Sequence, residues 1–302
     1  MNIAFFGTPE YCVPSLEALV ASRHKVVCVV TQPDRPSGRG SKMTVSPAKK
    51  FALENNIPVF QPKSISKELD VIFPSATSRD GVVKPDIIVT CAFGQILKQN
   101  VIDFCRYGVI NVHASLLPKY RGACPINFAI INGETKTGIT IMQTDVGIDT
   151  GDILYQVECD ISEHETAGEL TARLAVLGAE ALIKTLDQIE NGTVKRTPQN
   201  NAEASYYPML KKEDGALSLR GGQSPTWQSS VVNFNSPKDI VNFIRGMNPW
   251  PGAHAPSNYG EIRVLAAHVD RGELRFDIIQ APGGRAMAYR DYVNGHKNFK
   301  FI

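Results

Sequence analysis

The sequence lacks the long apolar run that would anchor a chain in a membrane. Its apolar stretches, such as residues 86–92, are far shorter than the ~20 residues that a membrane-spanning helix needs. Residues 1–7 carry no basic side chain and end on a glycine, so they do not form a secretory signal peptide. We therefore expect a cytoplasmic protein with no membrane partner.

Cysteine is sparse, and its spacing is wide. The chain has 6 cysteines, and the two nearest in sequence, Cys91 and Cys105, are not close enough to form a CxxC pair. Such spacing does not indicate a zinc site or a disulfide framework. We expect small buried thiols in a reducing compartment, and no metal.

Several familiar ligand-binding motifs are also missing. Residues 7–9 lack the GxGxxG turn of dinucleotide-binding folds, and residues 38–42 lack the GxxxxGK[ST] spacing of a phosphate loop. His164 and Glu165 have no second histidine to complete HExxH, and GxSxG does not occur. Nicotinamide oxidoreductases, P-loop enzymes, zinc proteases of this type and α/β-hydrolases are therefore disfavoured.

What is present is an alternation of strand and helix patterns over the first 190 residues. Runs rich in β-branched residues alternate with segments of helical spacing, and some runs are apolar on both faces. This pattern predicts a doubly covered parallel α/β sheet, Rossmann-like in its architecture. The expected strands cover residues 2–6, 25–30, 57–60, 86–90, 108–112, 138–143 and 153–159. The expected helices cover residues 14–21, a segment opened by Ser46-Pro47, and residues 165–189.

The composition changes after residue 190. We expect a catalytic domain over residues 1–190, a linker over 191–206 without regular structure, and a smaller β-rich domain over 207–302. The whole chain has 32 basic and 30 acidic residues, but residues 206–302 hold an excess of basic ones. In the second domain, Ser236 caps a predicted helix that reaches Met247, and residues 261–266 and 274–279 are predicted strands. Residues 221–230 are a predicted loop.

Polar side chains cluster at the end of one predicted strand. Asn111 and His113 alternate along it and therefore share a face, and Asp145 follows a later strand. An amide, an imidazole and a carboxylate could serve acyl transfer to an amine, because the amide can donate to an oxyanion and the imidazole can handle a proton. A structural histidine in a loop with a capping aspartate is equally compatible with the spacing alone.

Four motifs together resemble the methionyl-tRNA formyltransferases, a family within the 10-formyltetrahydrofolate-dependent formyltransferases. They are residues 6–9 (FGTP), 31–40 (TQPDRPSGRG), 111–122 (NVHASLLPKYRG) and 145–152 (DVGIDTGD). Residues 243–252 (FIRGMNPWPG) extend the similarity into the second domain. The resemblance implies transfer of a formyl group from 10-formyltetrahydrofolate to initiator methionyl-tRNA during translation initiation, by a protein that we expect to be a monomer.

The resemblance also implies roles for individual residues. Asn111, His113 and Asp145 would form the catalytic trio. The folate co-substrate would be lined by the residues of two segments, namely Ser115, Leu116, Leu117 and Pro118, and Phe93, Gly94, Gln95, Ile96 and Leu97. Arg35, Arg39 and Lys42 would contact tRNA from an exposed, adaptable loop.

Three other functions stay open at this stage. They are a formyltransferase for a small amine such as an amino sugar nucleotide, a formyltetrahydrofolate hydrolase, and a catalytically silent RNA-binding protein. The second domain also departs from the family, because residues 219–235 are additional and about two strands after residue 269 are missing. We therefore expect an OB-like barrel that is shortened.

Overall fold

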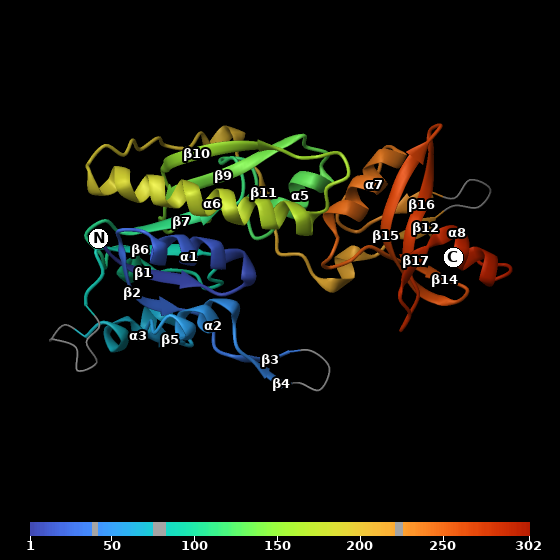
Figure 1. Ribbon diagram of the computed structural model, residues 1–302. Coiled ribbons are helices and arrows are strands. Elements are labelled where there is room, and N and C mark those ends of the chain that lie inside the picture. The colour runs from blue at the N-terminus through green and yellow to red at the C-terminus, as the bar shows by residue number, and fades with distance from the viewer. Residues whose placement is uncertain (38–41, 75–82, 221–225) are drawn as a thin grey trace. The chain divides into compact units, whose positions relative to one another are not determined.

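The chain folds into two compact units. The computed structural model describes residues 1–37, 42–74, 83–220 and 226–302 (Figure 1). Unit 1 contains residues 1–121, 138–158 and 172–205, and unit 2 contains residues 122–137, 159–171 and 206–302. Each unit is therefore assembled from three separate stretches of the chain, whereas the sequence suggested one continuous domain followed by another.

Unit 1 is organised by a seven-stranded sheet in the order β10-β9-β7-β6-β1-β2-β5. The expected strands are all present, as β1 (Asn2–Gly7), β2 (Lys25–Val30), β5 (Val59–Phe60), β6 (Ile87–Cys91), β7 (Val109–His113), β9 (Lys136–Gln143) and β10 (Ile153–Asp160). Five of them, from β5 to β7, pair in parallel. The carboxyl ends of these five strands therefore meet at one edge of the sheet.

The sheet is mixed rather than wholly parallel, because β9 runs antiparallel to β7. The reason lies in the connection. The chain leaves β7 at its carboxyl end and passes through residues 122–137 of unit 2, and it re-enters the sheet at that same end. A return to the amino end would have required a full crossover.

Helices cover both faces of the sheet. On one face, α3 (Ile65–Ile72) and α4 (Gln99–Ile102) pack against alternate residues of the parallel strands, including Phe6, Val30 and Val109. On the other face, α6 (Ala167–Glu190) lies across β7 and β9 (Figure 1). Gly178 permits this close approach, since an added Cβ would lie 3.0 Å from the Val112 side chain. Asn111 and His113 therefore point away from α6.

Two further helices and a hairpin follow the first strands. In chain order, η1 (Glu10–Cys12) and α1 (Val13–Ala21) connect β1 to β2. Helix α2 (Pro47–Glu54) begins as expected after Ser46, whose side chain accepts from the Lys49 amide. The segment expected to be a loop forms a short antiparallel hairpin, β3 (Arg35–Ser37) with β4 (Lys42–Thr44). Arg35 pairs with Thr44, so the backbone ladder outweighs the turn-forming composition there.

The expected linker is ordered along unit 1 up to residue 205. Thr197 exchanges two backbone hydrogen bonds of 2.9 Å with Ile153, the first residue of β10. A short helical turn, η2 (Asn201–Glu203), follows, and it is capped by the Asn200 side chain. Polar composition and proline predicted a segment without structure, but its side chains bond to unit 1, as described below.

Unit 2 combines an antiparallel sheet with helices. The sheet contains β14 (His254–Ser257), β15 (Gly260–Asp270), β16 (Glu273–Gln280) and β17 (Ala286–Ala288), in that order. The other elements of this region are β8 (Arg121–Gly122), β11 (Tyr206–Tyr207), η3 (Lys212–Gly215), β12 (Ser218–Arg220), β13 (Thr226–Gln228), α5 (Pro125–Ile131), α7 (Pro237–Gly246) and α8 (Tyr289–Gly295). Part of the predicted 221–230 loop is thus strand β13.

Helix α7 is the part of unit 2 that the sequence predicted most closely. Ser236 and Asp239 form a capping box at its start, and its apolar stripe is buried. It packs on α5, where Asn127 donates to the Gly246 carbonyl at 2.7 Å. Gly246 makes this contact possible, because an added Cβ would lie 2.5 Å from the Ile131 side chain. Residues 122–137 therefore belong to unit 2 through direct packing.

Candidate active site

The side chain of Asn111 is oriented by the neighbouring strand. Asn111 lies opposite Thr90 in the β6–β7 pairing, and the Thr90 hydroxyl donates to Asn111 Oδ1 at 2.9 Å. Since this bond occupies the amide oxygen, it directs the amide NH₂ group away from Thr90. The side chain is half-buried, so Asn111 can present a hydrogen-bond donor at the carboxyl end of β7.

His113 is the last residue of β7, and it is 5% exposed. Its Nε2 atom lies 2.9 Å from the Tyr120 carbonyl oxygen. A carbonyl oxygen can only accept, so Nε2 carries a hydrogen and Nδ1 is the ring atom left to exchange a proton. The position of Nδ1 therefore decides what chemistry this histidine can perform.

Asp149, rather than Asp145, provides the carboxylate that faces Nδ1. Asp149 Oδ2 lies 3.7 Å from His113 Nδ1, and both side chains are largely buried. Asp145 has a different position, since its Oδ1 accepts from the Gly147 amide at 3.1 Å and from the Thr150 hydroxyl at 2.6 Å. The sequence analysis assigned the carboxylate of the catalytic trio to Asp145, whereas the carboxylate that lies 3.7 Å from the imidazole is that of Asp149.

Asp145 instead shapes the loop that carries Asp149. Its two hydrogen bonds close a turn over residues 145–150, and two glycines allow the tight path. An added Cβ at Gly147 would meet the Thr150 side chain, and one at Gly151 would meet the Gln143 carbonyl oxygen. The turn that begins at Asp145 therefore brings the Asp149 carboxylate to the His113 imidazole.

Two residues at this site have a backbone conformation that L-residues rarely adopt. Tyr120 has φ of 61° and Asp149 has φ of 52°. Such conformations cost roughly 1–3 kcal/mol and persist only where surrounding contacts hold them. Tyr120 provides the acceptor for His113 Nε2, and Asp149 provides the carboxylate at Nδ1. Both partners of the imidazole thus lie on strained backbone.

The first expected folate segment, residues 93–97, follows β6 and is anchored to unit 1 on several sides. Phe93 is buried against Phe6, with ring centroids 5.1 Å apart, and its carbonyl accepts from Thr8. Gln95 bonds to the backbone of Ile65 and of Pro62, and Leu97 packs against the core. The side chain of Ile96, by contrast, is 88% exposed.

The second expected folate segment, residues 115–118, follows β7. Ser115 is fully buried, and its hydroxyl donates to the Lys119 carbonyl at 2.8 Å. Thr140 on β9 bonds to the backbone of Ser115 and of Leu117. Leu116 and Pro118 are half-buried. Because β6 and β7 are parallel neighbours, both expected folate segments leave the same edge of the sheet.

Of the expected tRNA-binding residues, Arg35 and Lys42 belong to the β3–β4 hairpin. Arg35 is exposed on β3, and the backbone of Lys42 belongs to β4. Arg39 lies outside the described residues, as does the side chain of Lys42. Lys49, another cation of this region, is not available, because it bonds to Asp34 at 2.6 Å and holds the pKa of that carboxyl below its usual range.

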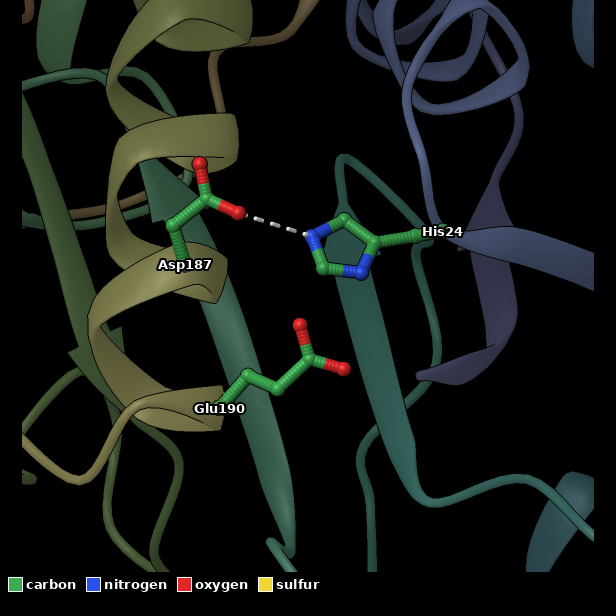
Figure 2. A group of neighbouring side chains, drawn as sticks. All are labelled: His24, Asp187 and Glu190. Carbon is green, nitrogen blue, oxygen red and sulfur yellow. Dashed lines mark ion pairs between the residues drawn. The ribbon is translucent and has the colours of Figure 1, made fainter.

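A second histidine with carboxylate neighbours lies at the amino ends of the strands. His24 precedes β2, and Asp187 and Glu190 end α6 (Figure 2). Their side-chain ligand atoms lie within 4.8 Å of one another. However, Arg23 contacts Asp187 at 2.7 Å and Glu190 at 2.8 Å, and the Met1 ammonium contacts Glu190 at 3.0 Å. Both carboxylates are thus already paired with cations of the chain, and the group forms an ion-pair network.

Sequence reasoning missed three residues of the site. Asp149 lies within a motif that was recognised, but the choice between its aspartates needed the loop geometry. Arg121 is 1% exposed, and Gln199 lies in the predicted linker, yet the two side chains bond to each other at 2.8 Å. An arginine in the polar end of the segment 115–122 gave no signal of burial. Among the described residues, no helix is long and apolar enough to cross a membrane.

Comparison with known proteins gives consistent matches. Residues 1–186 match the model of the formyl transferase family, and residues 227–275 match that of the formyl transferase C-terminal domain. A methionyl-tRNA formyltransferase of Acetivibrio thermocellus is 50% identical over 322 residues, which cover 98% of this chain and 97% of the relative.

Two solved structures share the fold at lower sequence identity. One is an N-formyltransferase of Helicobacter canadensis in complex with folinic acid and dTDP-3-aminofucose, with a TM-score of 0.63, 20% identity, and coverage of 95% of this chain and 98% of that one. The other is the methionyl-tRNA formyltransferase of Clostridium thermocellum, with a TM-score of 0.57, 16% identity, and coverage of 93% and 99%.

Proposed function

Because this chain belongs to the formyl transferase family, we propose that it transfers the formyl group of 10-formyltetrahydrofolate to the α-amine of initiator methionyl-tRNA. The product, N-formylmethionyl-tRNA, serves translation initiation, so the enzyme acts in the cytoplasm. The observation that carries the chemistry is the joint position of Asn111, His113 and Asp149 at one end of β7.

In this proposal, the amine nitrogen attacks the formyl carbon and a tetrahedral intermediate forms. The negative charge then develops on the formyl oxygen. The Asn111 amide suits stabilisation of that charge, because Thr90 already occupies its oxygen and orients its NH₂ group before the reaction. A donor that is oriented in advance needs no reorganisation as the charge appears.

The His113–Asp149 pair suits the proton transfer. The attacking amine must lose a proton, and N10 of the folate must gain one as its bond to the formyl carbon breaks. Nδ1 is the ring atom free to exchange a proton, and a proton arriving there meets the Asp149 carboxylate. No covalent enzyme intermediate is required, since the substrate amine is itself the nucleophile.

The two segments that leave β6 and β7 suit the folate co-substrate. The edge where they emerge also carries Asn111 and His113, so a formyl group bound there lies near both side chains. Exposed Ile96 and half-buried Leu116 and Pro118 provide apolar surface for an aromatic ring system. The Helicobacter canadensis relative was solved with the folate derivative folinic acid, which supports a folate ligand for this fold.

The test of the function is an acceptor comparison. The protein is incubated with 10-formyltetrahydrofolate and initiator methionyl-tRNA, elongator methionyl-tRNA, an amino sugar nucleotide or no acceptor. We expect formyl transfer to initiator methionyl-tRNA. Formylation of the sugar instead would identify a small-amine enzyme, and release of formate without an acceptor would identify a hydrolase. Either result would contradict the proposal, and so would binding of tRNA without any turnover.

We further propose that the β3–β4 hairpin contacts the tRNA through Arg35, Arg39 and Lys42. Each phosphate contact that is lost reduces the salt dependence of binding by about one counterion. Arg35→Gln combined with Lys42→Gln is therefore expected to raise KM for tRNA and to flatten the slope of log KM against log salt. Lys49→Gln is the control for charge in the same region. An unchanged slope in the double variant would exclude the hairpin from the tRNA contact.

A further inference from the structure

The segment of residues 197–205 bonds to both residues that face the His113 imidazole. Residues 197–205 lie within unit 1, and residue 206 begins the last stretch of unit 2. Gln199 near the start of this segment contacts the Asp149 loop, and Ser205 at its end contacts Tyr120. The two contacts therefore reach the two residues whose strained backbone was described above.

Gln199 makes the contacts on the Asp149 side. Its Nε2 atom donates to the Asp149 carbonyl at 2.8 Å and to the Gly151 carbonyl at 2.7 Å. These bonds fix the peptide groups that follow Asp149 and Gly151, so they restrain the backbone that carries the Asp149 carboxylate. One side chain thus supplies two of the bonds that keep Asp149 in its unusual conformation.

Arg121 holds the Gln199 side chain in place by hydrogen bonds to its amide oxygen. Its guanidinium donates to Gln199 Oε1 through Nε at 3.1 Å and through a terminal nitrogen at 2.8 Å. A further bond of 2.8 Å reaches Asn201 Oδ1. Because Arg121 is fully buried and occupies the Gln199 oxygen, the amide NH₂ of Gln199 can only face the loop carbonyls.

Ser205 makes the contacts on the Tyr120 side. Its hydroxyl accepts from the Tyr120 amide at 2.9 Å, and its carbonyl accepts from the Arg121 amide at 2.8 Å. The Tyr120 peptide is thereby fixed, and its carbonyl is the acceptor for His113 Nε2. The segment thus restrains the acceptor at one ring nitrogen and the carboxylate at the other.

We infer that Gln199 is a positioning residue, which holds the Asp149 carboxylate at His113 Nδ1 and is itself oriented by Arg121. The inference rests on the proposed function for its kinetic consequence, but the restraint on the loop stands on the contacts alone. Gln199 and Ser205 accordingly both belong to the framework around the His113 imidazole.

Two substitutions at position 199 separate positioning from simple structural support. Gln199→Glu keeps an acceptor for Arg121 but turns a carboxylate oxygen toward the Asp149 and Gly151 carbonyls, so both donations are lost. Gln199→Leu loses every polar contact. Misplacement of a reacting group by about 1 Å can cost on the order of 10²-fold in rate. We therefore expect kcat to fall by about ten- to a hundredfold in both variants, with KM for the folate nearly unchanged.

Asn200→Ala is the matched control. Its side chain is exposed and bonds to Glu203 and to the Ala202 amide, both inside the same segment. We expect kcat in this variant to equal that of the wild-type protein. If Gln199 only supported Arg121, Gln199→Glu would also retain full kcat, and that result would overturn the inference.

Hydrogen exchange provides a readout that does not depend on the reaction. We expect amide exchange over residues 145–152 to accelerate in both Gln199 variants and to stay unchanged in Asn200→Ala. Acceleration in a protein that fails to formylate methionyl-tRNA would leave the positioning role intact and contradict only the proposed function. Unchanged exchange in the Gln199 variants would overturn the positioning role, whatever the activity.

Discussion

Two buried histidines of unit 1 each lie beside an aspartate, but through different ring nitrogens and among different charges. His113 and His24 are each 5% exposed, and each has an aspartate oxygen within 3.7 Å of one ring nitrogen. They differ in what faces Nδ1. At His113 it is the Asp149 carboxylate, whereas at His24 it is the Met1 ammonium at 3.3 Å. A proton on Nδ1 would therefore meet a carboxylate at His113 and a positive charge at His24.

The carboxylates around the two rings differ in the same direction. Asp187 and Glu190 are neutralised by Arg23 and Met1, and burial together with the ammonium lowers the pKa of His24. Asp149, by contrast, is held through its backbone carbonyl, which accepts from the Gln199 side chain. Its carboxylate lies near the carboxyl end of β7, where Asn111 offers a hydrogen-bond donor. A histidine–carboxylate pair is therefore informative about function only when the other charges around it are known.

The largest effect is expected from replacing Asp149, beside His113, with asparagine, and the matched replacement of Asp187, beside His24, is the comparison. Asp149→Asn removes the charge that meets a proton at Nδ1, and comparable changes in proton-transfer systems cost on the order of 10²–10⁴-fold in turnover. Asp187→Asn, the matched change at the other histidine, should leave kcat unaltered. Formyl transfer kinetics measure both variants. Equal loss of kcat in the two would erase the distinction between the two sites.

A smaller loss is expected from Asn111→Ala. Removal of one oxyanion donor typically costs about 10²–10³-fold in rate. Folate affinity, measured by calorimetry, should be retained, because the amide acts on charge that develops during the reaction. Near-normal turnover in this variant would remove the carboxyl end of β7 from the mechanism.

Asp145 tests which aspartate of the loop does the chemistry. Asp145→Asn keeps the Oδ1 acceptor for Gly147 and Thr150, so kcat should be close to that of the wild-type protein. Asp145→Ala loses the turn and should lower kcat about tenfold, less than the ~10²-fold cost of a 1 Å misplacement. A large defect in Asp145→Asn would return the catalytic role to Asp145.

The smallest effect concerns the pH dependence of stability at His24. Its folded-state pKa lies below the ordinary value near 6.5, so the unfolded chain binds more protons on acidification and stability falls below about pH 6.5. His24→Asn keeps an acceptor for the ammonium and removes this titration. Denaturant unfolding between pH 7 and pH 5 should therefore show a flatter profile in the variant. An identical profile would mean that His24 is not the titrating group.

These sites also show what the sequence could and could not predict. Alternation along residues 109–113 placed Asn111 and His113 on one face, because strand geometry has a fixed period. The choice between Asp145 and Asp149 depended on a loop with a positive-φ residue, which no periodic pattern encodes. Ser236 and its capping box predicted α7, since a cap is a local interaction, whereas the antiparallel entry of β9 depends on a long connection through unit 2.

The interleaving of the two units limits how the chain can be divided. A fragment that ends at residue 205 would retain α5 but lose α7, and the face of α5 that carries Asn127 and Ile131 would be left without its partner helix. Exchange of the second unit between homologous proteins at residue 206 would likewise join an α5 from one parent to an α7 from the other. A working chimera must therefore take α5 and α7 from the same parent, although the contact between Asn127 and Gly246 spans 119 residues of sequence.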